Sequence, residues 1–189
     1  MNPTRYNPVS MALHWLLALL ILGSLAVGLY MTGLPFSPTR LRLYNWHKWA
    51  GMVILILSAA RLLWRLGHPP PADLPMPAWQ SRAAHGAHLT LYVLFFAVPL
   101  SGWAYSSAAG FPVVLFGVVP LPDWVTVSRE LADNLKPLHH WLAYCLGGLV
   151  ALHVAAALKH HWIDRDTLLQ SMLPSRQTRD NLEPTGPRP

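Results

Sequence analysis

The sequence predicts an all-α, integral membrane four-helix bundle, and three observations support this fold class. Of the 189 residues, 53% are hydrophobic and only 12% are charged, about half the charged share of an average soluble domain. Four apolar stretches approach the ~20 residues that a helix needs to cross a bilayer. Nine tryptophans suit the membrane–water interface. Intrinsic disorder is excluded by the low charge, and a disulfide scaffold is excluded because Cys145 is the single cysteine.

The four apolar stretches define the expected membrane spans. They cover residues 11–31, 46–66, 87–108 and 137–158. We expect them to form one domain, residues 1–174, followed by a polar tail over residues 175–189 that is disordered.

The connections between the spans differ in character. The proline-rich segment 67–82 predicts an extended strap. The longest connection, 109–136, is apolar but broken by prolines, so we expect it to lie on the membrane surface or at the bundle end. Pro137 suits the first turn of the fourth helix.

The basic residues predict the orientation. With four spans, both termini lie on one side, and nine of the fourteen lysines and arginines lie on that side. The excess predicts that the termini lie in the cytoplasm and that the spans contact membrane lipid. Nucleic-acid binding is excluded because the basic residues are divided between two faces.

Four of the ten histidines fall at matching depths in the spans. His14 and His153 lie toward the cytoplasmic side, and His47 and His139 lie toward the periplasmic side. Fourteen residues separate His139 from His153, which is about 21 Å of helix rise and nearly four whole turns. Both imidazoles therefore leave one helix face, and two cross-helix pairs are predicted.

Two such pairs suit two b-type haems, each clamped by two axial imidazoles. Zinc prefers four ligands close together, which this spacing does not provide. Gly51, one turn after His47, leaves room for a porphyrin or for close helix packing. Arg61, fourteen residues after His47, is a candidate partner of a haem propionate, with lipid contact as the alternative. Lys136, three residues before His139, could pair with a propionate or attract an anion.

Two further histidines are candidates for a quinone site. His88 lies near the cytoplasmic start of the third span, and His160 lies seven residues after His153 on the same helical face. An imidazole can supply both a hydrogen bond and a proton to a quinone. Contact with lipid headgroups is the alternative for both.

The motifs resemble the bacterial cytochrome b561 family of four-helix dihaem membrane cytochromes, which includes superoxide:ubiquinone oxidoreductases. The similarity extends along nearly all of residues 5–174. The matching motifs are Y-x7-HW from Tyr6, H-x3-G from His47, ARLLWRL at 60–66, AHGAHLTLYVLFFAVPLSG at 84–102 and LHHWLAYCLGGLVALHVAAALKHHW at 138–162. The resemblance implies His14 with His153 for the cytoplasmic haem iron and His47 with His139 for the periplasmic one. It also implies quinone reduction near the cytoplasmic haem and a periplasmic electron donor.

The function expected from these features is electron transfer from a periplasmic donor, superoxide, through two haem b groups to ubiquinone. An oxidoreductase of this kind needs no catalytic acid or nucleophile, because superoxide loses only an electron. One alternative is an electron-transfer subunit that docks on a periplasmic dehydrogenase or hydrogenase. A second, of a different class, is a histidine-lined metal or proton transporter, although none of the four spans contains a carboxylate.

Overall fold

The computed structural model describes residues 5–71 and 76–173. Four long helices dominate this part of the chain, and each is long and apolar enough to cross a membrane. They are α1 (Pro8–Thr32), α2 (Pro38–Gly67), α3 (Ala78–Ala108) and α4 (Arg129–Lys159). The predicted four-helix bundle is confirmed. The predicted disordered tail, 175–189, lies outside the described residues.

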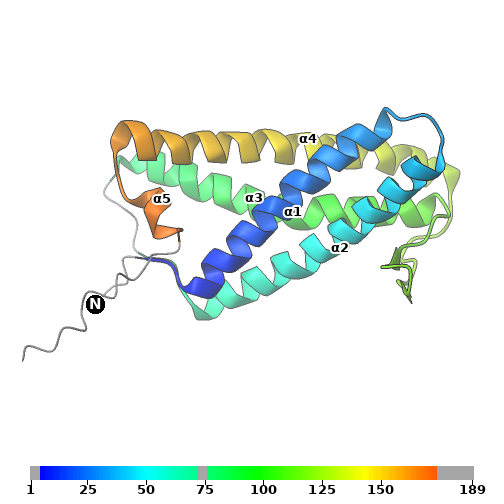
Figure 1. Cartoon of the computed structure of the whole chain (residues 1–189), viewed down its shortest axis with the longest axis horizontal. Coiled ribbons are helices and arrows are strands. Elements are labelled where there is room, and N and C mark those ends of the chain that lie inside the picture. The colour runs from blue at the N-terminus through cyan, green and yellow to red at the C-terminus, as the bar shows by residue number, and fades with distance from the viewer. Residues whose placement is uncertain (1–4, 72–75, 174–189) are drawn as a thin grey trace, which may run out of the picture.

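Short elements lie at the two ends of the bundle (Figure 1). A hairpin of β1 (Val114–Leu115) and β2 (Val119–Pro120) joins α3 to α4 and defines what we term the hairpin end. At the opposite end, the terminal end, α4 continues into the π-helical turn η1 (His160–Asp164) and the short helix α5 (Leu168–Ser171). The connection 109–136 therefore lies at a bundle end, although its last eight residues already belong to α4.

Every long helix begins before its apolar stretch, because polar caps and prolines start the helices. Asn7 and Ser37 accept hydrogen bonds from Val9 N and Arg40 N, and a proline follows each cap. In α4 the cap is Ser128, which accepts from Leu131 N. The expectation that Pro137 opens the fourth helix is wrong, since Pro137 lies inside α4. The reason is that the apolar pattern reports the depth of the bilayer, whereas the caps set the ends of the helix.

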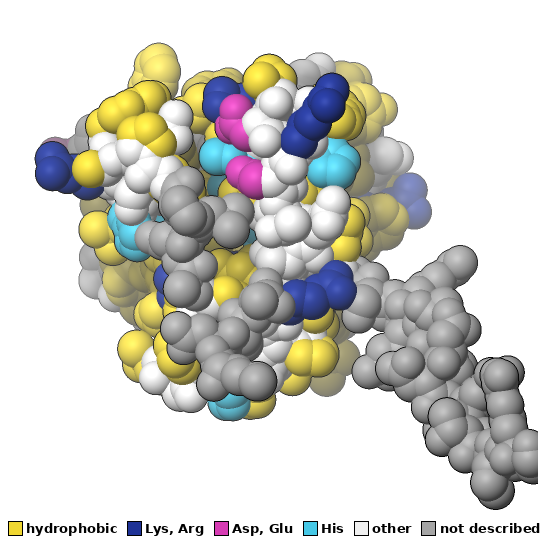
Figure 2. Space-filling model, turned by 90° about the vertical axis from the view of Figure 1, so that its left-hand side faces the viewer, with side chains coloured by type: hydrophobic (Ala, Val, Ile, Leu, Met, Phe, Trp, Pro, Cys, Tyr) yellow, Lys and Arg dark blue, Asp and Glu magenta, His cyan; other side chains and the backbone are white. Residues whose placement is uncertain are grey.

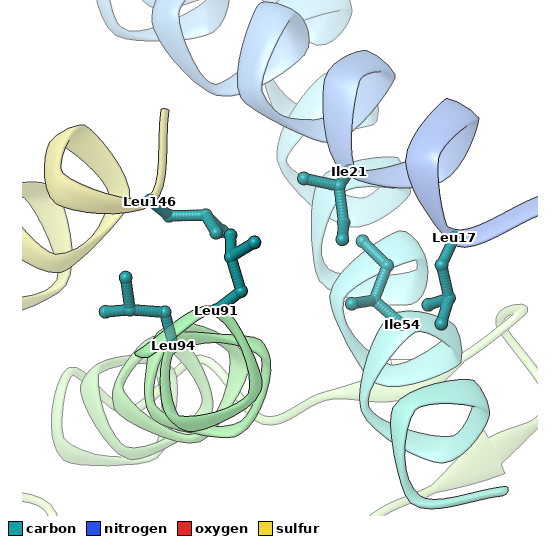
Figure 3. Close-up of a cluster of buried hydrophobic side chains, with 6 residues drawn as sticks. All are labelled: Leu17, Ile21, Ile54, Leu91, Leu94 and Leu146. Carbon is teal, nitrogen blue, oxygen red and sulfur yellow. The ribbon is translucent and has the colours of Figure 1, made fainter. Parts of the chain in front are cut away.

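The helices pack as two pairs, α1 with α2 and α3 with α4, joined through α2 and α3. Leucine and isoleucine side chains fill the centre between the pairs (Figure 3). This buried cluster consists of Leu17, Ile21, Ile54, Leu91, Leu94 and Leu146. A cavity borders this cluster and is lined by Ile21, Ile54 and Leu146.

The two ends of the described chain are fastened together at the terminal end. Arg5 donates to the carbonyl oxygens of Gln170 (2.9 Å) and Leu173 (2.7 Å). The indole Nε1 of Trp15 donates to Met172 O at 2.8 Å. These bonds hold α5 against the start of α1. Figure 2 shows this end, where histidine, acidic and basic side chains gather.

Candidate functional site

At the hairpin end, α2 and α4 bring the rings of His47 and His139 close together across the bundle. Their ring centres lie 6.1 Å apart, with an interplanar angle of 82°. Two imidazoles bound to opposite sides of one metal ion by bonds of about 2 Å place their ring centres about 6 Å apart. The separation therefore fits a pair of axial ligands to one iron.

The hydrogen bonds of this pair leave one nitrogen of each ring free. His47 Nδ1 lies 3.2 Å from Ser24 O, and His139 Nδ1 lies 3.0 Å from Val98 O. A carbonyl oxygen can only accept, so Nδ1 carries the proton in both rings and Nε2 keeps its lone pair. Metal-binding histidines characteristically donate their second nitrogen in this way. The oxygen Oγ of Ser24 and that of Ser101 lie 3.2 Å from the same two Nδ1 atoms.

Two glycines make room for these rings. A Cβ atom on Gly102 would lie 2.9 Å from His139 Cε1, and one on Gly28 would lie 3.1 Å from His47 Cε1. The sequence alone does not assign this role to either glycine, because neither is near its histidine in the sequence. A glycine at the same depth as a histidine on the next helix is the signal that could have revealed them.

A cavity of about 440 Å³ opens between the two rings. Apart from the histidines and Ser24, its lining is apolar. The lining residues are Ile21, Ser24, Leu25, His47, Gly51, Ile54, Phe95, Val98, Pro99, His139, Ala143 and Leu146. A Cβ atom on Gly51 would meet nothing within 4 Å, so Gly51 leaves open space beside His47. An apolar cavity between two free imidazole nitrogens fits a haem.

At the terminal end, α1 and α4 bring together His14 and His153. Their ring centres lie 6.2 Å apart at an interplanar angle of 63°. His88, from α3, lies against His153, with ring centres 5.6 Å apart. His14, His88 and His153 therefore form one cluster, whereas the sequence predicts a pair of ligands with His88 at a quinone site.

Arg61 lies in the same cluster, with Nη1 2.9 Å from His14 Nδ1. A guanidinium only donates, so this Nδ1 is an acceptor, in contrast to the Nδ1 atoms of His47 and His139. If His14 bound iron through Nε2, Nδ1 would carry the proton and Arg61 would be released from it. The released guanidinium would then be available to an anionic group beside the ring.

The two candidate residues for a quinone site, His88 and His160, have different neighbours. His88 lies against His153 although it is exposed itself, whereas His160 Nδ1 lies 2.6 Å from Asp166 Oδ2 and 3.3 Å from Asp164 Oδ2. His160 starts the wider π-helical turn η1, which brings both carboxylates to its ring. The α-helical spacing used for the sequence analysis does not anticipate this turn.

The side chain of Lys136 is exposed on α4. Among the residues that the structure describes, no partner holds its ammonium group. The structure therefore does not bring Lys136 into the His47–His139 cavity.

A second cavity, of about 290 Å³, lies near Arg61 at the terminal end. Arg65 also lines it, with its guanidinium 5.8 Å from the ring centre of Tyr92. The hydroxyl of Tyr92 is buried and has no hydrogen-bond partner within the described segments. The remaining lining residues are Tyr6, Ser10, His68 and Pro70. This cavity offers hydrogen-bond donors to a ligand and was not anticipated from the sequence.

Comparison with known proteins gives consistent matches along the chain. The sequence profile described as prokaryotic cytochrome b561 matches residues 5–175. The chain is 38% identical to cytochrome b561 homolog 2 of Escherichia coli strain K12 over 180 residues, which cover 91% of this chain and 93% of the relative. It is 32% identical to a probable superoxide oxidase CybB of Yersinia pestis, covering 92% and 98%. Cytochrome b561 homolog 1 of E. coli K12 is also 32% identical, covering 92% and 99%.

The fold, the apolar cavity between two histidines and these matches agree. The resemblance seen in the motifs is confirmed. It follows that the protein is a bacterial membrane protein of a family that transfers electrons through b-type haem. The chain belongs to the prokaryotic cytochrome b561 family.

Proposed function

We propose that this cytochrome binds two haem b groups, one at each end of the bundle. His47 and His139 hold the haem at the hairpin end, and His14 and His153 hold the other. The observation that carries the proposal is the pair of ring separations, 6.1 and 6.2 Å, at opposite ends of the bundle. When bound, the haem iron supplies one-electron redox chemistry. The protein fixes the axial rings, excludes water and provides the apolar surroundings that tune the potential.

The proposed electron donor is superoxide, which reacts at the hairpin end on the periplasmic side. The relative named probable superoxide oxidase supports this donor. We also propose a bacterial inner-membrane location with both termini in the cytoplasm, supported by the nine of fourteen lysines and arginines on the side of the termini. Two superoxide anions lose one electron each and become dioxygen. Ubiquinone takes both electrons and two protons and becomes ubiquinol.

The proposed ubiquinone site lies at the terminal end, where His88 and His160 are the candidate residues. His88 lies against His153, which suits transfer close to the cytoplasmic haem. His160, held by two carboxylates at the bundle end, suits proton supply. The cavity lined by Arg61, Arg65 and Tyr92 lies near the same cluster and offers hydrogen-bond donors to a quinone headgroup.

The wild-type protein tests this function directly. A pulse of potassium superoxide, given to purified protein in detergent with ubiquinone-1, should be followed by haem reduction and then by ubiquinol formation. We expect two haems per chain and about one ubiquinol for every two superoxide anions consumed. Stopped-flow absorbance and a haem assay give these numbers, with superoxide dismutase added as the control. Haem reduction without ubiquinol formation would refute the assigned acceptor, and no reaction with superoxide would refute the donor.

Arg61, Gly51 and Lys136 remain our proposed contacts of the porphyrin or its propionates. Gly51 borders the cavity at the hairpin end, and Arg61 contacts a candidate ligand at the terminal end. Lys136, exposed three residues before His139, would reach only the outer edge of the site.

The variant Arg61→Gln should lower the reduction potential of the haem at the terminal end. Removing a cation destabilises the reduced haem, which carries the additional negative charge. At a partly buried site the expected fall is on the order of tens of millivolts. A spectroscopic redox titration measures it, and Arg42→Gln, at the hairpin end, is the matched control. Equal potentials in Arg61→Gln and wild type would assign Arg61 to lipid contact.

A second function is favoured by one observation, the apolar surface of the hairpin. Phe111, Phe116 and Val118 are 68%, 60% and 77% exposed. Exposed apolar residues in a compact patch are typical of protein docking surfaces. An electron-transfer subunit that docks on a periplasmic dehydrogenase or hydrogenase is therefore the alternative. Membership in a cytochrome family argues against the transporter hypothesis.

A further inference from the structure

Lys48 follows His47 directly in α2, and neutral oxygen atoms hold its ammonium group. Nζ lies 3.4 Å from Ser106 Oγ, 3.3 Å from Phe111 O and 3.2 Å from Pro112 O. The hydroxyl of Ser106 also donates to the carbonyl of Phe111. A lysine ammonium has three N–H donors and no acceptor, so these three oxygens match its capacity.

The charge of this ammonium is not neutralised nearby. Within residues 5–71 and 76–173, the carboxylates that form ion pairs do so with Arg129, Lys159 and His160, and none pairs with Lys48. Its side chain is half-buried, and salt screens such a charge less than one in open solvent. Lys48 therefore places a cationic group, without an ion-pair partner in the described segments, directly after His47.

The next residue, Trp49, fastens the hairpin to the same part of α2. Its indole Nε1 donates to Val114 O at 2.6 Å, and its ring centre lies 5.7 Å from that of Phe116. Three consecutive residues thus have different roles. His47 lines the cavity, Lys48 carries the ammonium group and Trp49 anchors the hairpin. These contacts hold the ammonium group of Lys48 between α2 and the segment that leads from α3 into the hairpin.

We propose that Lys48 selects an anionic electron donor at the hairpin end. The proposal rests on the proposed function and names the residue that distinguishes superoxide from an uncharged reductant. The superoxide anion loses one electron to the protein-bound haem and becomes dioxygen, and no proton moves. A positive charge fixed at the place of encounter raises the rate for an anion and not for a neutral molecule.

The test compares Lys48→Met with Lys48→Arg and uses two donors. One donor is superoxide, and the other is the neutral radical of photoreduced 5-deazariboflavin. We expect Lys48→Met to slow haem reduction by superoxide about tenfold, with a weaker dependence on ionic strength. Its rate with the neutral radical should equal that of wild type. Lys48→Arg, which keeps the charge, should react with superoxide at close to the wild-type rate.

The matched control is Arg129→Met, because Arg129 is exposed on the same side and already pairs with Asp133 at 3.9 Å. It should leave both rates unchanged. In Lys48→Met, the rates of haem reduction by both donors could fall equally while hydrogen exchange over residues 111–121 becomes faster. Lys48 would then only anchor the hairpin, and the proposal would be overturned. A wild-type protein that accepts electrons from the neutral radical and none from superoxide would refute the proposed donor itself.

Discussion

Purified His139→Ala should contain one haem per chain, in place of the two that we propose for wild type. Removing this imidazole leaves the iron at the hairpin end with His47 alone, and the cavity gains space where the ring was. Because His14 and His153 lie at the other end of the bundle, the haem there should remain. A haem assay with reduced-minus-oxidised spectra measures both effects. Electron transfer from a periplasmic donor should fall to the background rate.

The neighbouring His140→Ala is the matched control, since its ring centre lies 6.3 Å from that of His139 and no ring contact joins it to another helix within residues 5–71 and 76–173. It should keep both haems. A second variant, His139→Gly with added imidazole, separates loss of a ligand from loss of the fold, because free imidazole can enter the space and restore the spectrum. Two haems in His139→Ala would disprove the ligand assignment at the hairpin end.

The variant Gly102→Val should also lose the haem at the hairpin end, although no ligand is changed. A Cβ atom on residue 102 would lie 2.9 Å from His139 Cε1, so the valine must displace the ring. Displacement breaks the bond from His139 Nδ1–H to Val98 O and moves Nε2 away from the cavity. Overpacking of this kind costs about 1–3 kcal/mol, so the bundle should persist with one haem.

Gly23→Val is the control for this substitution, because a Cβ atom there would meet nothing within 4 Å. Haem content and thermal unfolding, measured side by side, distinguish a displaced ring from an unfolded bundle. A Gly102→Val protein with two haems and wild-type spectra would show that His139 tolerates the added bulk. The glycine would then have no role in positioning the ring.

The sequence predicts the spans well because apolarity over ~20 residues reports the bilayer directly. It also anticipates which histidines lie at the same depth, because helix rise converts a separation of fourteen residues into a distance. Their role as haem ligands remains a proposal. The starts of the helices are less predictable, since caps such as Ser128 lie in polar segments without an apolar pattern.

The contacts between helices were not predictable from periodicity. Gly28 and Gly102 leave space for histidine rings on other helices, and only the packing of the bundle shows which ring lies against each glycine. The surroundings of His160 depend on a π-helical turn, near which two carboxylates approach its ring. The residue spacing of an α-helix does not predict such a turn. Lys48 is a similar case, because its partners come from the connection after α3.

The bonds from Arg5 and Trp15 to residues 170–173 also bear on the order of assembly. A ribosome makes α1 first and α5 last, so these bonds form only when the chain is nearly finished. Trp15 follows His14 directly, and its ring centre lies 5.2 Å from that of His14. The surroundings of His14 are therefore complete only after α5 docks, whereas His47 and His139 can meet as soon as α4 is inserted. Biogenesis in the membrane should accordingly finish the hairpin end before the terminal end.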